Sequence, residues 1–152
     1  SAPRVSTFRR RRKGMFSNTR VLTVEWGHCD PAGIVFNPRF FEYFDWSTAL
    51  LVAAATGTDK SALLKRYDAA GIPLVDTRAV FRAPLRFGEE ARIVSSVAAL
   101  RGSSFDVEHK LFKGKTLCVE GFETRVWTAF DVEGRIRARE LPEAVRQALA
   151  GG

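Results

Sequence analysis

A single carboxylate, Asp30, lies in a short stretch that carries the residue types needed for chemistry on a carbonyl group. Gly33 follows it, and the pair Asn37 and Pro38 comes a few residues later. Asn is favoured at the N-cap of a helix and Pro at the first helical position, so this pair predicts a helix with Asn37 as its cap. An acid that attacks or activates water, placed just before a helix terminus, suits acyl transfer.

The backbone N–H groups of the first helical turn form the second half of this predicted site. They have no intrahelical acceptors, and the positive end of the helix dipole favours negative charge beside them. We therefore predict that the amides of Phe40 and Phe41 polarise the carbonyl oxygen of a substrate, and that Gly33 permits close approach of the backbone. Asp30 before Pro-Ala-Gly is also a common turn composition, so a purely structural role is the alternative.

The run DPAGIV from Asp30 to Val35, followed by an aromatic-rich helix, resembles the active-site loop of the 4-hydroxybenzoyl-CoA thioesterases, a family of hotdog-fold enzymes. The resemblance extends to Gly27 and Cys29 before the acid and to Pro38 after it. It implies hydrolysis of an acyl-CoA thioester to a carboxylic acid and free CoA. Asp30 would be the nucleophile or the general base, and no metal or redox cofactor is implied.

The predicted substrate-binding residues are Gly33, Phe36, Asn37 and Arg101. Phe36, with Phe40 and Phe41, would line a pocket for an aromatic or short acyl group, although core packing is the alternative for at least one of these rings. Arg101 stands where the resembled family binds CoA phosphates, but Gly102 and Ser103 follow it where further basic residues are common. Three arginines on one strand are alternative contacts: Arg78, Arg82 and Arg86.

Two other classes of function compete with hydrolysis. A hotdog hydratase or dehydratase needs a histidine paired with the acid, and the chain has only His28 and His109. The second rival is a non-catalytic binder, either of acyl-CoA or of nucleic acid through the basic N-terminal arm. Glu42 and Asp45 are possible second acids on the helix, but we favour a solvated or interface-facing stripe for them.

The hydrophobic pattern predicts a strand over residues 19–26, a largely apolar helix over residues 38–56 and a shorter helical segment within residues 58–71. Strict alternation then predicts a long strand over residues 75–87, with Pro84 at a bulge or an edge. Further strands at hairpin spacing and a C-terminal helix complete the prediction: residues 91–100, 105–112 and 116–130, then Glu143–Leu149.

One long apolar helix followed by hairpin-linked strands predicts an α+β domain in which the sheet covers the helix. The resemblance implies the same: a hotdog fold, with an antiparallel sheet wrapped around a long central helix. It also implies a homo-oligomer, a dimer or a dimer of dimers. A curved sheet around one helix leaves an edge strand that needs a partner or protection.

The chain has 152 residues, 45% of them hydrophobic, which suits one domain with a real core. The first 20 residues hold seven of the 24 basic residues and no acid, so 17 basic residues face 17 acidic ones in the remainder. We predict a basic N-terminal arm over residues 1–18, a hotdog domain over residues 19–152, and no binding of nucleic acid by the domain. The absence of an apolar run of ~18 residues argues against a membrane span. Two distant cysteines, Cys29 and Cys118, favour a reducing, cytoplasmic location.

Overall fold

A computed structural model describes residues 15–152, and the basic cluster at residues 9–13 lies outside them. The strands are β1 (Ser17–Thr23), β2 (Leu74–Phe81), β3 (Glu90–Leu100), β4 (Ser104–Lys113), β5 (Thr116–Val126), β6 (Thr128–Phe130) and β7 (Ile136–Ala138). The helices are α1 (Asn37–Thr56), α2 (Lys60–Arg66) and α3 (Glu143–Leu149), with a 3-10 turn, η1 (Trp26–His28). None of the helices in residues 15–152 is long and apolar enough to cross a membrane.

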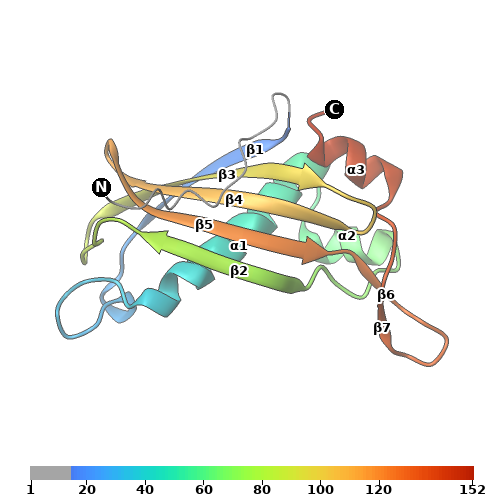
Figure 1. Cartoon of the computed structure of the whole chain (residues 1–152), viewed down its shortest axis with the longest axis horizontal. Coiled ribbons are helices and arrows are strands. Elements are labelled where there is room, and N and C mark those ends of the chain that lie inside the picture. Colours follow the sequence, from blue (N-terminus) through green and yellow to red (C-terminus); the bar gives the residue numbers. More distant parts are fainter. Residues whose placement is uncertain (1–14) are drawn as a thin grey trace, which may run out of the picture.

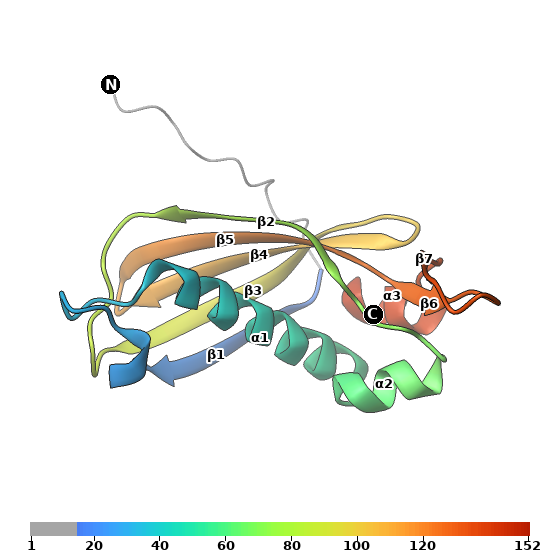
Figure 2. The same cartoon turned by 90° about the horizontal axis from the view of Figure 1, so that it is seen from below.

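The main sheet is antiparallel and has the strand order β1-β3-β4-β5-β2 (Figure 1). The long helix α1 runs along one face of this sheet, and α2 lies at its C-terminal end (Figure 2). The two edge strands, β1 and β2, therefore lie on opposite sides of α1. This confirms the predicted α+β hotdog architecture, with an antiparallel sheet around a central helix.

Two predicted strands are shorter in the structure. The strand predicted over residues 75–87 ends as β2 at Phe81, because the N–H groups of Arg82 and Ala83 both donate to the carbonyl of Cys118, at 2.8 and 3.1 Å. Pro84 follows this irregularity. The strand predicted over residues 116–130 is divided at Trp127, whose N–H turns to the carbonyl of Ser103 at 2.7 Å.

The sheet face under α1 is apolar at both ends and polar in the middle. Ser95 on β3 lies opposite His109 on β4, and Glu123 on β5 joins them. His109 Nε2 lies 2.6 Å from Glu123 Oε2, and its Nδ1 lies 2.7 Å from the hydroxyl of Ser95. From α1, the hydroxyl of Thr48 donates to the same carboxylate oxygen at 2.8 Å. We call these four side chains, together with Arg125, the polar layer.

The polar layer divides the interior into two apolar clusters. One surrounds the first half of α1 and includes Phe44, Ile93 and Leu111. The other surrounds the second half and includes Leu51 and Phe105. All of these side chains are fully or almost fully buried, so the charged groups between them are shielded from solvent as well.

Helix and sheet pack tightly against each other at Gly121, next to the polar layer. A methyl group at this position would lie 2.5 Å from the ring of Phe44. That ring stacks on His109 with 4.8 Å between the ring centres. Glycine at residue 121 is therefore required by the packing of α1, and the stacked ring covers the imidazole from the helix side.

Glu123 provides a test of the polar layer. Burial alone would raise its pKa, but the hydrogen bond from His109 and the charges of His109 and Arg125 outweigh burial and lower it. Glu123→Gln should cost about 3 kcal/mol or more in the free energy of unfolding at neutral pH, because it leaves the buried Arg125 with only the exposed Asp45 as its anion and removes the charged acceptor of His109 and Thr48.

Urea denaturation measures this difference, with the exposed Glu133→Gln as control, for which we expect less than about 0.5 kcal/mol. Because the folded-state pKa of Glu123 is depressed, its contribution is complete above the unfolded value of 4.5 and is lost as the pH falls through the folded value. The difference in the free energy of unfolding between wild type and Glu123→Gln should therefore become smaller below about pH 4.5. A gap that stays constant there would contradict an ionised Glu123.

Candidate active site

The loop that carries Asp30 is a tight antiparallel turn. Cys29 and Val35 form an antiparallel β-bridge, and the N–H of Asp30 donates to the carbonyl of Ile34 at 2.9 Å. The N–H of Gly33 returns to the carbonyl of Asp30 at 2.9 Å, and Gly33 has a φ of 81°, a conformation in which glycine is favoured. The Asp30 side chain is half-buried, and its Oδ1 accepts the N–H of Ala32 at 2.8 Å.

This turn is held against the rest of the fold at its second half. The N–H of Val35 donates to the carbonyl of Leu85 at 2.8 Å, and the N–H of Phe36 donates to the carbonyl of His28 at 2.9 Å. Residues 28–30 therefore run beside residues 34–36, and the segment after β2 supports them. The carboxylate lies near one end of this paired segment, and α1 begins at the other.

The prediction that Asn37 caps α1 is wrong. The N-cap is Phe36, with extended φ and ψ of −66° and 125°, and Asn37 is the first helical residue, with an exposed side chain that makes no capping hydrogen bond. The helix starts earlier because the contact with His28 fixes Phe36 in the extended conformation of an N-cap. The amides of Phe40 and Phe41 are consequently one position deeper in the helix than predicted.

The register of the helix decides which first-turn amide is free. The N–H of Phe36 is bonded to His28, Pro38 has no N–H, and the N–H of Arg39 donates to the carbonyl of Phe36 at 2.8 Å. Within residues 15–152, the N–H of Asn37 has no acceptor. Sequence reasoning missed this donor because Pro is acceptable at either of the first two helical positions.

A pocket of about 270 Å³ opens beside this free amide. Ile34, Asn37 and Phe40 line one side, and residues 81–85 line the other. Phe40 belongs to the apolar cluster, with 3% of its surface exposed, whereas Phe36 is 53% exposed. Phe41 is half-buried. The structure thus places Asn37 and Phe40 at this pocket. Gly33 and Phe36 are not among its lining residues, and Asp30 lies at the far end of the paired segment.

Arg101 is not part of this cluster within one chain. The loop lies near Glu90, which pairs with Thr23 at the start of β3, and Arg101 follows the other end of that strand. An 11-residue strand spans roughly 35 Å. Arg101 forms an ion pair with Asp106, and hydrogen bonding to this carboxylate raises the pKa of Arg101.

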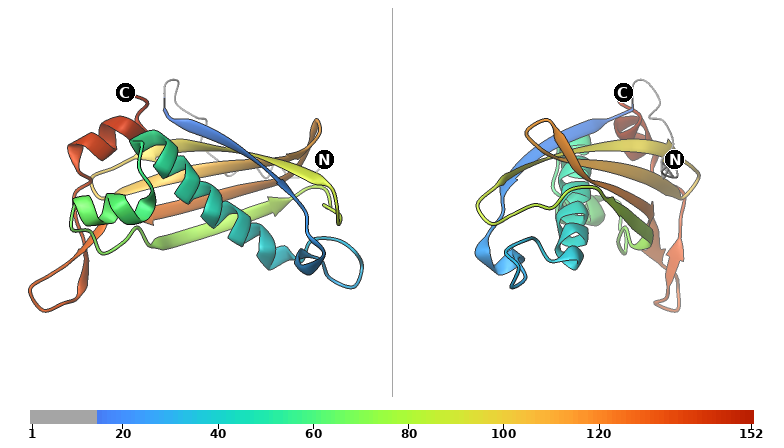
Figure 3. Two further views of the ribbon diagram at one scale, coloured as in Figure 1. Left: turned by 180° about the vertical axis from the view of Figure 1, so that it is seen from behind. Right: turned by 60° about the vertical axis from the view of Figure 1, so that its left-hand side comes forward.

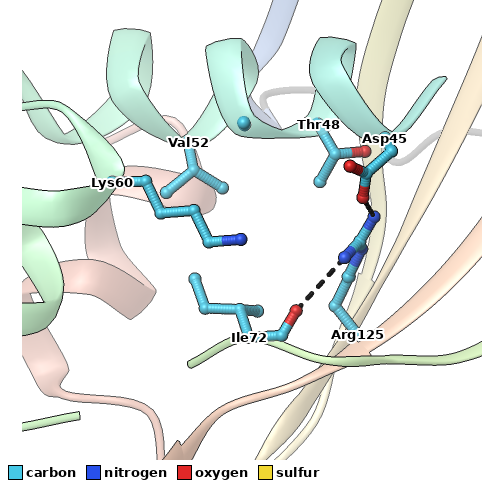
Figure 4. A pocket seen from close by; sticks show the side chains of 7 residues that line it. Asp45, Thr48, Val52, Lys60, Ile72 and Arg125 are labelled. Carbon is cyan, nitrogen blue, oxygen red and sulfur yellow. Dashed lines mark hydrogen bonds and ion pairs between the residues drawn. The ribbon is translucent and has the colours of Figure 1, made fainter. Parts of the chain in front are cut away.

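A second, very small pocket lies further along α1 on the same side as β2 (Figure 4). Its volume of about 10 Å³ is enough for one water molecule. Arg125 forms an ion pair with Asp45 and donates to the carbonyl of Ile72 at 3.2 Å, and Lys60 extends into the pocket from α2. Asp45 is therefore paired with Arg125, but its side chain is still 64% exposed, as expected for a solvated or interface-facing stripe.

Sequence reasoning also missed Thr48, Ser95, His109, Glu123 and Arg125 as a group. One signal in the sequence could have identified them. Side chains of a strand alternate between the two faces of a sheet, and these polar residues occupy positions that face the core. On β5, Val119 and Gly121 face the helix, and Glu123 and Arg125 continue that face. Charged residues at such positions indicate buried partners.

Neither histidine is paired with Asp30. The hydroxyl of Tyr43 lies 2.8 Å from Nδ1 of His28, which also accepts the N–H of Glu25 at 3.2 Å. Burial raises the pKa of Tyr43 to about 12, so the phenol stays protonated and donates to this nitrogen. His109 belongs to the polar layer. Among residues 15–152, no three His, Cys, Asp or Glu side chains are grouped to hold a metal ion.

The start of α1 can be tested against another helix of the same chain. Asn37→Ala should change the free energy of unfolding by less than about 0.5 kcal/mol, because the Asn37 side chain caps nothing. Asp59→Ala should cost about 1 kcal/mol, since Asp59 accepts the N–H of Ala62 at the start of α2, at 2.8 Å. Thermal and urea unfolding of both variants measure the difference, and equal losses would restore Asn37 as a cap.

Comparison with known proteins places these features in context. Residues 24–149 match the family described as the Thioesterase-like superfamily. The chain is 26% identical over 132 residues to 4-hydroxybenzoyl-CoA thioesterase from Pseudomonas sp. (strain CBS-3), covering 83% of this chain and 92% of the relative. The solved structure of that enzyme matches with a TM-score of 0.79 and 25% identity, over 88% of this chain and 99% of the other. A gentisyl-coenzyme A thioesterase structure matches with a TM-score of 0.76 and 30% identity, over 87% and 99%.

Proposed function

The chain belongs to the Thioesterase-like superfamily, and from this premise we propose that it hydrolyses an aromatic acyl-CoA to the free acid and CoA at the loop of Asp30. One observation carries the proposal: a half-buried carboxylate and an unpaired helix-terminal N–H lie at the two ends of one short paired segment. Attack on a thioester requires these two groups, an acid and a donor for the developing oxyanion.

In the proposed mechanism, the thioester carbonyl oxygen accepts the N–H of Asn37 at the positive end of α1. Asp30 then attacks the carbonyl carbon, or it takes a proton from a water molecule that attacks. The C–S bond breaks, and CoA leaves as the thiolate, which takes up a proton. If Asp30 has attacked, water then cleaves the acyl–Asp30 anhydride, which releases the acid and restores the carboxylate. If Asp30 acts as a base, the attacking water has itself supplied the second oxygen of the acid. The amides of Phe40 and Phe41 are the alternative donors. They lie one and two positions beyond the first three helical residues.

The acyl group would lie along the side of α1 that faces β2. Asn37, Phe41 and Asp45 follow one another at four-residue spacing and share this side. Asp45 lies about 12 Å from the helix start along the axis, beside Arg125 and Lys60 (Figure 4). The relatives act, by their names, on 4-hydroxybenzoyl-CoA and gentisyl-CoA, which supports an aromatic acyl group here.

The CoA part of the substrate would require a second copy of the chain if Arg101 is to contact it, because Arg101 lies far from Asp30 in its own subunit. The edge strand β2 supports an assembly of two or more chains: Leu74 and Val75 are 41% and 59% exposed, and no other strand of residues 15–152 pairs with its outer side. We therefore retain a dimer, or a dimer of dimers, as part of the proposal. The cysteines, Cys29 and Cys118, are free thiols, which fits a reducing cytoplasm.

Asp30→Asn tests the carboxylate. Asn keeps an oxygen for the N–H of Ala32, so the loop should keep its shape, while the nucleophile or base is lost. We expect kcat for 4-hydroxybenzoyl-CoA, followed by release of free thiol, to fall by about 10² or more. Asp68→Asn, at an exposed loop position, should keep wild-type turnover. Wild-type kcat in Asp30→Asn would leave the chain as an acyl-CoA binder or move the active site elsewhere.

Asn37→Pro tests the backbone donor. Proline deletes the N–H at residue 37 but suits the first turn of a helix, and the extended conformation of Phe36 is the one that a following proline requires. We expect an unchanged melting temperature and a kcat reduced by about 10² to 10³, the effect of removing one oxyanion donor. Asn37→Ala retains the N–H and should keep its kcat. Equal kcat in the two variants would assign the oxyanion to the deeper amides of Phe40 and Phe41.

A further inference from the structure

A groove of about 570 Å³ lies on the opposite side of α1 from the proposed acyl pocket, between the helix and β1. In Figure 3, right, β1 in blue and β2 in dark green flank the helix. The groove is lined by Arg20, Leu22, His28, Glu42, Tyr43 and Trp46, among others. Trp46 is 63% exposed and forms an aromatic wall. The volume of the groove is that of a small-molecule binding site.

Arg20 is the unusual residue of this groove. Its side chain extends from β1 toward the helix side and is half-buried, and its Nε is buried without a hydrogen-bond partner. Within residues 15–152 no carboxylate forms an ion pair with it: Glu25 and Glu42 line the same groove, but they pair with His28 and Arg39. Buried charged groups normally have a partner, because an unpaired one loses its hydration without compensation.

The rest of the chain does not supply the missing anion. Residues 1–14 contain neither Asp nor Glu. The guanidinium of Arg20 therefore has no anion from its own chain, and its fork of N–H donors suits the two oxygens of a carboxylate. The groove offers one unpaired cation beside two carboxylates, which favours a ligand with a single negative charge over a polyanion such as CoA. Trp46 provides an exposed ring surface next to that charge, whereas Tyr43 also lines the groove but is buried.

We propose that this groove is a second ligand site, which binds an aromatic carboxylate through Arg20 and the exposed ring of Trp46. The choice of ligand rests on the proposed function, since an aromatic acid is the product class of that reaction. The site also adjoins the catalytic loop. His28 lines the groove, and its backbone carbonyl accepts the N–H of Phe36 at the start of α1.

Calorimetric titration of the full chain with benzoate and with 4-hydroxybenzoate tests the proposal. Arg20→Met should weaken binding at least about tenfold, the loss expected for a hydrogen bond to a charged group. The exposed Arg66→Met should bind as the wild type does. Without ligand, Arg20→Met should melt at the same temperature or higher, because it removes an unpaired charge, so weaker binding cannot be ascribed to misfolding.

Three outcomes would overturn the second site. Equal affinity in Arg20→Met would show that the acid binds elsewhere. If the acyl-CoA displaces benzoate, or if Asn37→Pro no longer binds benzoate, then benzoate binds in the catalytic pocket. Dissociation of an oligomer in Arg20→Met, with no benzoate bound by the wild type, would assign the missing anion to a second copy of the chain. The titration needs no turnover, so it can succeed even if Asp30 is not catalytic.

Discussion

The carboxylate of Glu123 is the interaction on which the middle of the fold depends. It accepts hydrogen bonds from His109 on β4, from Thr48 on α1 and from Arg125 on its own strand, and so it joins the helix to two strands of the sheet. Apolar packing alone is non-directional and would allow α1 to slide or rotate on the sheet. A fully bonded polar group between two apolar clusters removes that freedom, because any shift leaves a buried donor or acceptor unpaired.

The orientation set by the polar layer determines what each side of α1 presents. On the side of β2, Arg125 emerges from the layer to pair with Asp45, in line with the free amide of Asn37 and the pocket beside Phe40. On the side of β1, Tyr43 bonds His28, and Arg20 forms no ion pair with a carboxylate of residues 15–152. One helix therefore separates two chemically different surfaces. The loop of Asp30 reaches both, through Phe36 and His28.

The sequence pattern predicted the elements well and their ends less well. Long periodic stretches decide between helix and strand, so α1 and the positions of the long strands along the chain followed from local patterns. Element ends depend on partners that are distant in the chain. The extended Phe36 depends on His28, and the end of β2 depends on the carbonyl of Cys118. The polar layer escaped prediction for the same reason, because its members come from four elements. The roles of Asp30, Gly33, Phe40, Phe41 and Arg101 are still proposals.

The composition of the polar layer has a consequence for how this scaffold can change over generations. The members are hydrogen-bond partners of one another, so a substitution of one residue leaves buried polar groups of its neighbours without partners. A simultaneous substitution of the whole set by apolar residues of equal volume need not weaken the fold. Single substitutions in the polar layer are thus destabilising, although a fully apolar interior could be stable. The interior at Ser95, His109 and Glu123 should consequently behave as one inherited unit, retained or replaced together, while the surfaces on either side of α1 diversify around it.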